Sequence, residues 1–189
     1  MKKPMTKGSF EYIKQRKKRQ LSLTLLMFGI ALGIFVLGLA LNKFDKRNIF
    51  TVFAVLAVLP STKILISYII LIPFHSISKE RYDAVMNATP EGVTVWTDVV
   101  FSSPEKVMML DFMVIDHHFV ICYTENKDKM KMMEEYLRTG ITKREYHYQL
   151  EMYDDFTRFT KRIGKLQLDE SQKDQNYKDT VEFLSSLMV

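Results

Sequence analysis

The chain has 189 residues, one cysteine and a formal net charge of +5. This length allows one domain of ordinary size, or a small domain with an appendage. The single cysteine, Cys122, excludes an internal disulfide and a thiolate metal site, and it fits a reducing compartment. Residues 1–20 contain eight Lys or Arg and one acid, whereas residues 75–189 contain 15 basic and 20 acidic residues. The larger part of the chain therefore lacks the basic excess that nucleic-acid binding requires.

Two long apolar segments follow the basic residues 1–20, which are expected to form a cytoplasmic tail. The first segment spans residues 21–41 (LSLTLLMFGIALGIFVLGLAL) and carries no charge. As a helix it covers about 30 Å, the thickness of the hydrocarbon core of a bilayer. A signal peptide has a shorter apolar core, so the segment predicts a transmembrane helix. Small residues at helical spacing would let a second helix approach closely; they are Gly29, Gly33, Gly38 and Ala40.

The second apolar segment, residues 49–74, contains Pro60 and Lys63. Its apolar content outweighs the roughly 3 kcal/mol that a lysine costs at mid-bilayer. Pro60 removes one helical hydrogen bond and predicts a kink. Lys63 has two interpretations: a charge in a transport pathway, or a side chain that extends to the inner interface and keeps its ammonium hydrated. The second is favoured, because two helices cannot enclose a polar pathway unless the protein oligomerises.

The charges that flank these segments predict the orientation of the hairpin. Eight basic residues precede the first span and three lie in the loop between the spans, which places the N-terminus inside. We therefore expect a multi-pass protein of the plasma (cell) membrane with both termini in the cytoplasm. The cluster KQRKKR would lie against anionic lipid headgroups, at about 1 kcal/mol per charge. The predicted interface residues are Lys14, Arg16, Lys17, Lys18, Arg19 and Lys63.

Residues 75–166 are expected to form a cytoplasmic α/β domain. Ser76 or Ser78 would cap a first helix, which ends before Pro90. Three segments rich in β-branched and aromatic residues then predict an antiparallel meander. These segments are Val93–Ser102, Lys106–Ile115 and Phe119–Glu125.

The rest of the chain alternates between helix and strand patterns. Asn126 opens a helix that Gly140 is expected to end. A fourth strand covers residues 144–153, and Asp154 is expected to cap the next helix. A linker and an amphipathic helix occupy residues 167–189. The predicted fold class is α+β, with a two-helix transmembrane hairpin at 21–74 and a small α-β-β-β-α-β-α domain with a mixed sheet.

Two aspartates lie within the first two predicted strands, and one short motif ends the third. They are Asp98 in WTDVV, Asp111 in MLDFMVI, and YTE at residues 123–125. With the order of elements over residues 78–166, this pattern resembles the core of the restriction-endonuclease-like superfamily, and most of all its nuclease-related branch. In that branch an acid precedes the apolar run of the second strand, and a Glu-x-Lys pair ends the third. The anchor and domain together also resemble a group of small uncharacterised bacterial membrane proteins.

The resemblance implies a magnesium-dependent nuclease only if its carboxylates and lysine are present. The metal needs carboxylate ligands, and a lysine orients the attacking water. Asp111 could supply one ligand, but Tyr123 stands in place of the second carboxylate and cannot bind a hard cation. Glu125 would have to replace it, and Lys127 lies past the end of the strand. The catalytic candidates Asp98, Asp111 and Glu125 are therefore interpreted as a vestigial site.

The histidines and the cysteine predict no separate site. The pair His117 and His118 suggests a metal site with Asp116 and Glu125, but adjacent strand residues point to opposite faces, so both imidazoles cannot easily reach one ion. A turn explains these residues equally well. We expect neither a metal nor a cofactor. Structural roles are expected for the remaining three, which are His75, His147 and the buried thiol of Cys122.

Three functional hypotheses follow from the sequence. The preferred one is a non-enzymatic cytoplasmic module that the hairpin holds at the membrane and that acts by binding a protein partner or by self-assembly. The second is a membrane-tethered, magnesium-dependent nuclease that uses Asp98, Asp111 and Glu125 in a relaxed motif. The third places Lys63 in a transport pathway. The expected partners are membrane lipids and a protein or a second copy of the chain, and nucleic acid is not expected.

Overall fold

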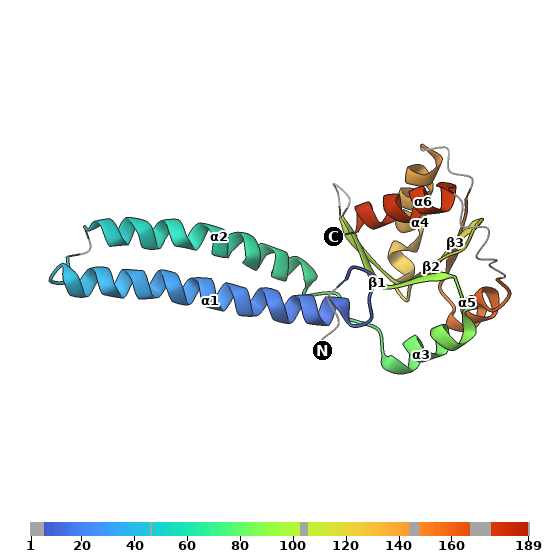
Figure 1. Ribbon diagram of the computed structural model, residues 1–189, viewed down its shortest axis with the longest axis horizontal. Helices are drawn as coiled ribbons and strands as arrows, with labels where there is room; N and C mark the ends of the chain where they lie inside the picture. Colours follow the sequence, from blue (N-terminus) through green and yellow to red (C-terminus); the bar gives the residue numbers. More distant parts are fainter. Residues whose placement is uncertain (1–5, 46, 103–105, 144–147, 167–174, 189) are drawn as a thin grey trace. The chain divides into compact units, whose positions relative to one another are not determined.

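The computed structural model describes residues 6–45, 47–102, 106–143, 148–166 and 175–188. The chain divides into two compact units (Figure 1). One unit covers residues 13–75 and contains two long helices. The other combines residues 1–12 with residues 76–189, so the chain enters and leaves the helical unit from the same globular unit.

The helical unit is a hairpin of α1 (Tyr12–Leu41) and α2 (Ile49–Leu71). Both helices are long and apolar enough to cross a membrane, with mean hydropathies of 2.5 and 2.2 over their most apolar stretches. Helix α1 begins nine residues before the predicted span, so the basic cluster belongs to the same continuous helix as the apolar segment. Helix α2 continues through Pro60.

Small side chains line the contact between α1 and α2. Within the apolar part of α1 the buried residues are Thr24, Ala31 and Gly38, which recur every seven residues. Ala54 and Ser61 are buried in α2 at the same spacing, and the last residue of that helix, Leu71, is buried as well. A seven-residue repeat keeps the contact on one side of each helix, and small residues let membrane helices approach closely. We call these five residues the seam.

The glycines of α1 do not all serve this close approach. A Cβ added to Gly38 would lie 2.4 Å from the Cβ of Phe50, so no larger residue fits there without a shift. An added Cβ at Gly29 or Gly33 would meet no atom within 4 Å, and Ala40 is exposed. The expectation that Gly29, Gly33 and Ala40 bring the second helix close is therefore wrong. Within the hairpin, Gly38 alone among α1's glycines has that role.

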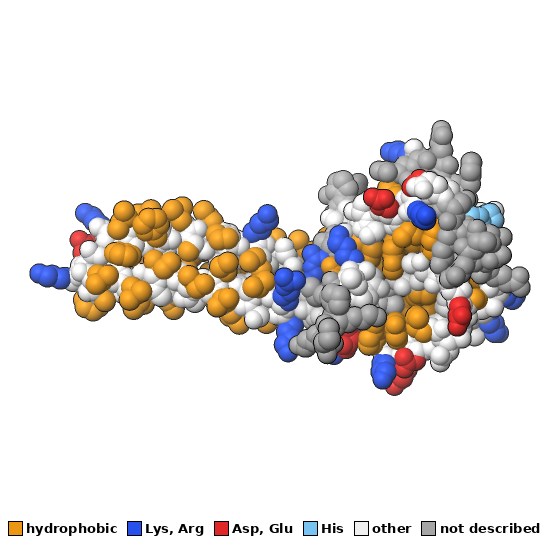
Figure 2. Space-filling view, viewed as in Figure 1, with side chains coloured by type: hydrophobic (Ala, Val, Ile, Leu, Met, Phe, Trp, Pro, Cys, Tyr) orange, Lys and Arg blue, Asp and Glu red, His pale blue; other side chains and the backbone are white. Residues whose placement is uncertain are grey.

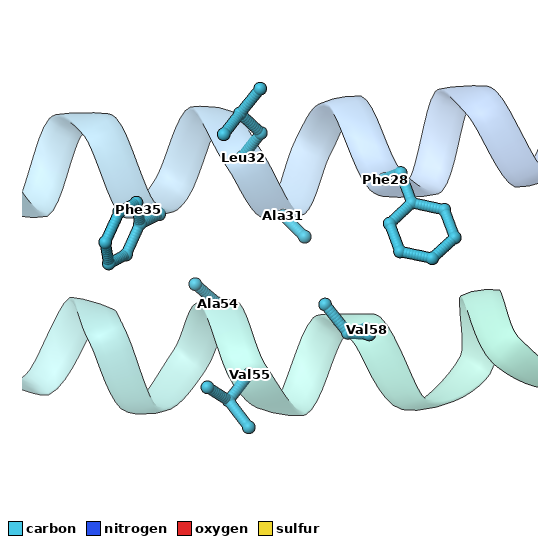
Figure 3. A pocket seen from close by; sticks show the side chains of 7 residues that line it. All are labelled: Phe28, Ala31, Leu32, Phe35, Ala54, Val55 and Val58. Atoms are coloured by element: carbon cyan, nitrogen blue, oxygen red, sulfur yellow. The ribbon is translucent and has the colours of Figure 1, made fainter.

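An apolar groove of about 270 Å³ lies between the two helices. Phe28, Ala31 and Phe35 point toward α2, and Ala54 and Val58 point toward α1 (Figure 3). Every side chain of its lining is apolar, the remaining two being Leu32 and Val55. The groove therefore offers no group that could bind or react with a polar substrate.

Polar groups fix both ends of the hairpin. At the turn, the Asn48 side chain accepts a hydrogen bond from the N–H of Thr51 at 3.0 Å and caps α2. At the opposite end, the Lys17 ammonium donates to the carbonyls of Ile72, at 2.8 Å, and Phe74. A helix C-terminus leaves such carbonyls without partners inside the helix. Lys17 therefore ties α1 to the end of α2.

The globular unit is a four-stranded sheet with helices on both faces (Figure 1). The strand order is β1-β2-β3-β4; the first three strands form an antiparallel meander, and β4 runs parallel to β3 after a helical crossover. This arrangement confirms the predicted α+β class, the order of elements and the mixed sheet. The elements are α3 (Lys79–Ala88), β1 (Thr94–Ser102), β2 (Val107–Ile115), β3 (Phe119–Tyr123), α4 (Lys127–Thr142), β4 (Gln149–Tyr153), α5 (Phe156–Ile163) and α6 (Gln175–Leu187).

Three helices of this unit have an N-cap residue. The side chain of each cap accepts a hydrogen bond from the backbone N–H three residues later. Ser78 and Asn126 cap α3 and α4, as predicted. Asp155, not Asp154, caps α5, and Asp154 instead pairs with Lys127 at 3.2 Å. The prediction was one residue out because two neighbouring aspartates could both serve as the cap.

Helix α4 continues past Gly140 to Thr142, so the prediction that Gly140 ends the helix is wrong. The glycine has a packing role instead. A Cβ at this position would lie 3.0 Å from the ring of Phe183 in α6. A glycine near a predicted helix end therefore has two explanations, a cap or a close approach, and here the second holds.

Separate apolar clusters fill the two faces of the sheet. Helices α4 and α6 cover one cluster, and α3 and α5 cover the other. Representative members of the first cluster are Leu110, Met133, Leu137 and Leu184, and of the second Val85, Phe112, Ile121 and Phe159. Met188, which follows α6, also belongs to the first cluster.

Both ends of the described chain cover the outer edge of β1. The N–H of Thr97 donates to the carbonyl of Gly8 at 2.9 Å, and Phe101 forms a bridge with Met188. The Lys7 ammonium donates to the carbonyl of Met188 at 2.6 Å, so the two ends also contact each other. An open strand edge is a template for pairing with other chains. These contacts protect β1 from such pairing.

Candidate functional site

Asp98 and Asp111 lie opposite each other in the middle of the β1–β2 pair. The paired residues on either side of them are Thr97 with Phe112 and Val99 with Leu110. The two acids are thus brought close to each other in the sheet. We call Asp98, Asp111 and Glu125 the acidic cluster.

Both strands change the face of the sheet to which their side chains point at these aspartates. In β2, Leu110 lies in the cluster under α4 and α6, whereas Phe112 lies in the opposite cluster. In β1, Val95 and Val99 lie in opposite clusters in the same way. Residues two or four apart share a face in an uninterrupted strand. The interruption coincides with Asp98, whose φ of +53° lies in the left-handed region and costs roughly 1–3 kcal/mol.

Asp98 is fully buried, and its Oδ1 accepts a hydrogen bond from the N–H of Ile77 at 3.1 Å. Ile77 lies between the end of the hairpin and α3. A hydrogen bond of this kind stabilises a fold by about 0.5–1.5 kcal/mol. The carboxylate of Asp98 therefore holds the segment that returns from the hairpin against β1.

Asp111 accepts a hydrogen bond from the N–H of Glu125 at its Oδ2, at 2.8 Å. Burial, and to a smaller extent the negative charges of Glu125 and Asp98, raise the pKa of Asp111 to about 6. The backbone hydrogen bond and the Arg81 guanidinium act in the opposite direction. The pKa rises because burial and like charges disfavour the ionised carboxyl more than the hydrogen bond and Arg81 favour it.

Arg81 of α3 forms an ion pair and a hydrogen bond with Glu125. Its guanidinium also lies over the Phe156 ring, 5.5 Å from the centroid. The hydrogen bond from Arg81 to Glu125 raises the pKa of Arg81. Because the two side chains are 40% and 56% exposed, the pair stabilises the fold by about 1 kcal/mol at most. Sequence reasoning missed Arg81, which lies 44 residues from Glu125 with no local pattern that joins them.

Tyr123 is part of the core. Only 3% of it is exposed, and its ring lies 5.4 Å from Phe159 and 5.5 Å from Phe156, between centroids. Burial raises the pKa of its phenol above the ordinary value. The residue that replaces the second carboxylate of the resemblance therefore packs under α5.

A metal site is not formed in the part of the chain that the structure describes. No group of three or more His, Cys, Asp or Glu residues is arranged there to hold an ion. In the acidic cluster, Asp98 and Asp111 each give one oxygen to a backbone N–H, and Glu125 pairs with Arg81. Through these contacts the acidic cluster connects the sheet to α3 and to the start of α4.

The turn between β2 and β3 explains Asp116, His117 and His118. Asp116 Oδ1 accepts the N–H of His117 at 2.6 Å, which is a local turn contact. The two imidazole rings lie 4.5 Å apart between centroids, at 61°. Cys122 is fully buried in β3, and burial strongly raises the pKa of its thiol. His75 is exposed at the end of the hairpin, and His147 lies outside the described residues.

The predicted interface residues differ in their surroundings. Lys14, Lys18 and Arg19 are exposed on α1, and Lys63 is exposed on α2 outside the seam. Arg16 is half-buried. Lys17 instead turns its ammonium to the end of α2.

No family model, no curated protein and no solved structure matches this chain.

Proposed function

We propose that this protein is a two-span protein of the plasma membrane that holds its α+β domain on the cytoplasmic side. In this proposal the domain acts by binding a protein partner or by self-assembly, and it does not catalyse a reaction. Membrane lipids are the partners of the hairpin. Each part of the proposal has its own support and its own test.

The distribution of exposed apolar residues supports the membrane anchor most strongly. Within the described residues, the strongly exposed large apolar side chains lie between Leu21 and Ile72, apart from Met86. Figure 2 shows these side chains over the visible surface of α1 and α2. Only 17% and 11% of the most apolar stretches of the two helices are buried, which is unlike the core helices of a soluble protein. In water each Å² of such surface costs about 25 cal/mol, whereas acyl chains cover it without this cost.

The orientation of the proposed anchor rests on charge and connectivity. Lys14, Lys18 and Arg19 lie on α1 just before its apolar segment, where they would contact anionic headgroups of the inner leaflet. The segments before α1 and after α2 belong to one globular unit. Because that unit cannot lie on both sides of a bilayer, the hairpin must return the chain to the side from which it came.

A membrane extraction experiment tests the anchor. The full-length protein should stay in the pellet when isolated membranes are washed with alkaline carbonate, and detergent should release it. Release by carbonate alone would contradict the two spans. A matched variant with Lys18→Gln and Arg19→Gln should remain membrane-bound, since two exposed charges contribute only about 1 kcal/mol each.

The absence of catalysis is proposed because the acidic cluster is engaged in structural contacts. Asp98 and Asp111 each accept a hydrogen bond from a backbone N–H, and Glu125 forms an ion pair with Arg81. The excess of acids in residues 75–189 also opposes the approach of a phosphate backbone. Cross-linking in intact membranes should then yield adducts with a second copy or with one reproducible partner. Recovery of the uncross-linked monomer alone would contradict an adaptor role.

A membrane-tethered nuclease of the resembled type is the second candidate. It is favoured by the strained backbone of Asp98 and the raised pKa of Asp111, because both features are common at functional sites. Its test is magnesium-dependent DNA cleavage by the full-length protein in detergent. Cleavage that Asp111→Ala abolishes and Asp83→Ala retains would establish this candidate. No cleavage by the unmodified protein would remove it.

A further inference from the structure

The two segments that connect the hairpin to the globular unit are held at consecutive residues of β1. The incoming segment, residues 6–12, is bound through the carbonyl of Gly8, which accepts the N–H of Thr97 at 2.9 Å. The outgoing segment is bound through the N–H of Ile77, which donates to Asp98 Oδ1 at 3.1 Å. One point of the sheet therefore holds the two segments of the globular unit that flank the hairpin.

Further contacts make this attachment tight. Gly8 has a φ of +77°, and an added Cβ would lie 2.8 Å from the ring of Trp96. Phe10 lies against Tyr82 of α3, with ring centroids 4.5 Å apart. The incoming segment thus contacts the helix into which the outgoing segment leads. The two segments are therefore linked through α3 as well as through β1.

The same point of β1 is continuous with the acidic cluster. Asp98 has the left-handed backbone conformation and lies opposite Asp111. Asp111 in turn accepts the N–H of Glu125, just before α4 begins. Asp98 accepts the N–H of the outgoing segment, and its neighbour Thr97 donates to the incoming segment, so both segments are attached at this strained point. From there the contacts lead to Asp111 and Glu125.

We propose that the Gly8–Thr97 and Ile77–Asp98 contacts form a clamp that couples the spacing of α1 and α2 to the acidic cluster. A change in the separation of the attached helix ends alters the backbone at Asp98 and the hydrogen bond from Glu125 to Asp111. A change at the acidic cluster alters the helix spacing in the same way, because energetic coupling between two sites is reciprocal. Through the clamp the domain would respond to the separation of α1 and α2. This role goes beyond the proposed function, in which the hairpin only holds the domain at the membrane.

Lys17 offers a way to perturb the hairpin without touching the globular unit. Its ammonium ties α1 to the carbonyls of Ile72 and Phe74, all within the helical unit. Trp96 is the single tryptophan of the chain and lies against Gly8, so its fluorescence reports on the incoming segment.

The experiment uses the full-length protein in lipid nanodiscs, and in detergent micelles if it does not enter nanodiscs. Failure to enter would count against the membrane anchor, and the micelle measurement would still decide the clamp.

The first arm compares Lys17→Met with Lys63→Met, which replaces an exposed lysine of α2. Lys17→Met should shift the emission of Trp96 and speed hydrogen exchange at the Ile77 N–H by about tenfold, as expected if one charge-assisted hydrogen bond is weakened. Lys63→Met should change neither quantity. If Lys17→Met leaves both unchanged, the proposed coupling is absent.

The second arm works in the reverse direction, from Asp98 to the helices. Spin labels at Lys18→Cys and Ile69→Cys, both exposed positions, measure the helix separation in a Cys122→Ser background. Asp98→Ala removes the acceptor for the Ile77 N–H and should broaden the distance distribution. Asp98→Asn keeps an oxygen acceptor and should leave it narrow. An unchanged distribution for Asp98→Ala would overturn the proposal, and if that variant does not fold, the Lys17→Met arm decides it.

Discussion

Away from the open ends of its helices, where Ile13 and Leu71 are buried, the hairpin buries small residues, whereas the globular domain buries large ones. The seam of the hairpin consists of small side chains, such as Ala31 and Gly38, while Leu25 is 65% exposed. In the domain the large residues are inside, and Phe101 and Phe112 are fully buried. A domain in water gains stability by hiding its large apolar side chains. Helices in hydrocarbon gain nothing from this and associate through close contact of small residues instead. The contrast is the one expected if the hairpin lies in a membrane, as proposed, and the domain lies in water.

The largest expected difference concerns two phenylalanines, one in each region. Phe112→Ala empties part of a core cluster and should lower the free energy of unfolding by about 3–5 kcal/mol. Phe53→Ala, at a position on α2 that is 53% exposed, should lower it by less than about 1 kcal/mol. Denaturant unfolding of the full-length protein in detergent measures both. Equal losses would remove the contrast between the regions.

Acid should affect the domain through Asp111. Its pKa is about 6 in the folded protein and close to 3.8 in the unfolded chain, so the folded state binds a proton more tightly between these values. The contribution of Asp111 to stability is therefore fully present below about pH 4 and is lost as the pH rises through 6, by about 2–3 kcal/mol. The difference in unfolding free energy between the unmodified protein and Asp111→Asn, measured from pH 4 to pH 7, isolates this term. Asp83→Asn is the control, and a flat difference would contradict the raised pKa.

The seam predicts unequal effects for two glycines of the same helix. Gly38→Ala places a methyl group against Phe50 and should weaken the contact of α1 with α2 by about 1–3 kcal/mol. Gly33→Ala meets no neighbour and should be neutral or slightly stabilising. Distances between spin labels at Leu37→Cys and Val52→Cys, in a Cys122→Ser background, report on the contact. A larger separation for Gly33→Ala than for Gly38→Ala would contradict the assigned seam.

The smallest effect is expected at the exposed ion pair of the acidic cluster. Glu125→Gln removes the charge that pairs with Arg81 but keeps the backbone N–H that Asp111 accepts. Its cost in unfolding free energy should stay below about 1 kcal/mol, and added salt should reduce it further. Thermal unfolding at two salt concentrations tests this. A loss above about 2 kcal/mol would show that the pair is a main support of the fold.

Much of the fold could be predicted because its causes are local. Alternation and β-branched residues mark the strands, and Ser78 and Asn126 are the caps of α3 and α4. The apolar residues of α5 and α6 recur at the helical period and face the sheet. Errors arose where one residue type has two uses, as with Gly140 and with the neighbouring Asp154 and Asp155.

The candidate site could be predicted only in part, because its causes are not local. Asp98 and Asp111 were identified as acids inside apolar strands, which need a partner wherever they are buried. The partner of Asp98 is a backbone N–H of Ile77, and no side-chain pattern reveals it. The left-handed φ of Asp98 and the pairing of Arg81 with Glu125 also arise only when distant segments meet. The seven-residue spacing of Thr24, Ala31 and Gly38 was present in the sequence, but the shorter spacing of Gly29 and Gly33 was taken for the contact.

The accessibility of two introduced cysteines tests the central claim most directly. Lys43→Cys lies in the turn between α1 and α2, and Lys178→Cys lies on the exposed side of α6. A membrane-impermeant maleimide applied to intact cells should label the first and not the second, and the second should react once the cells are opened. The buried Cys122 is the internal control for unfolded protein. Labelling of Lys178→Cys in intact cells would contradict a hairpin that leaves the domain in the cytoplasm.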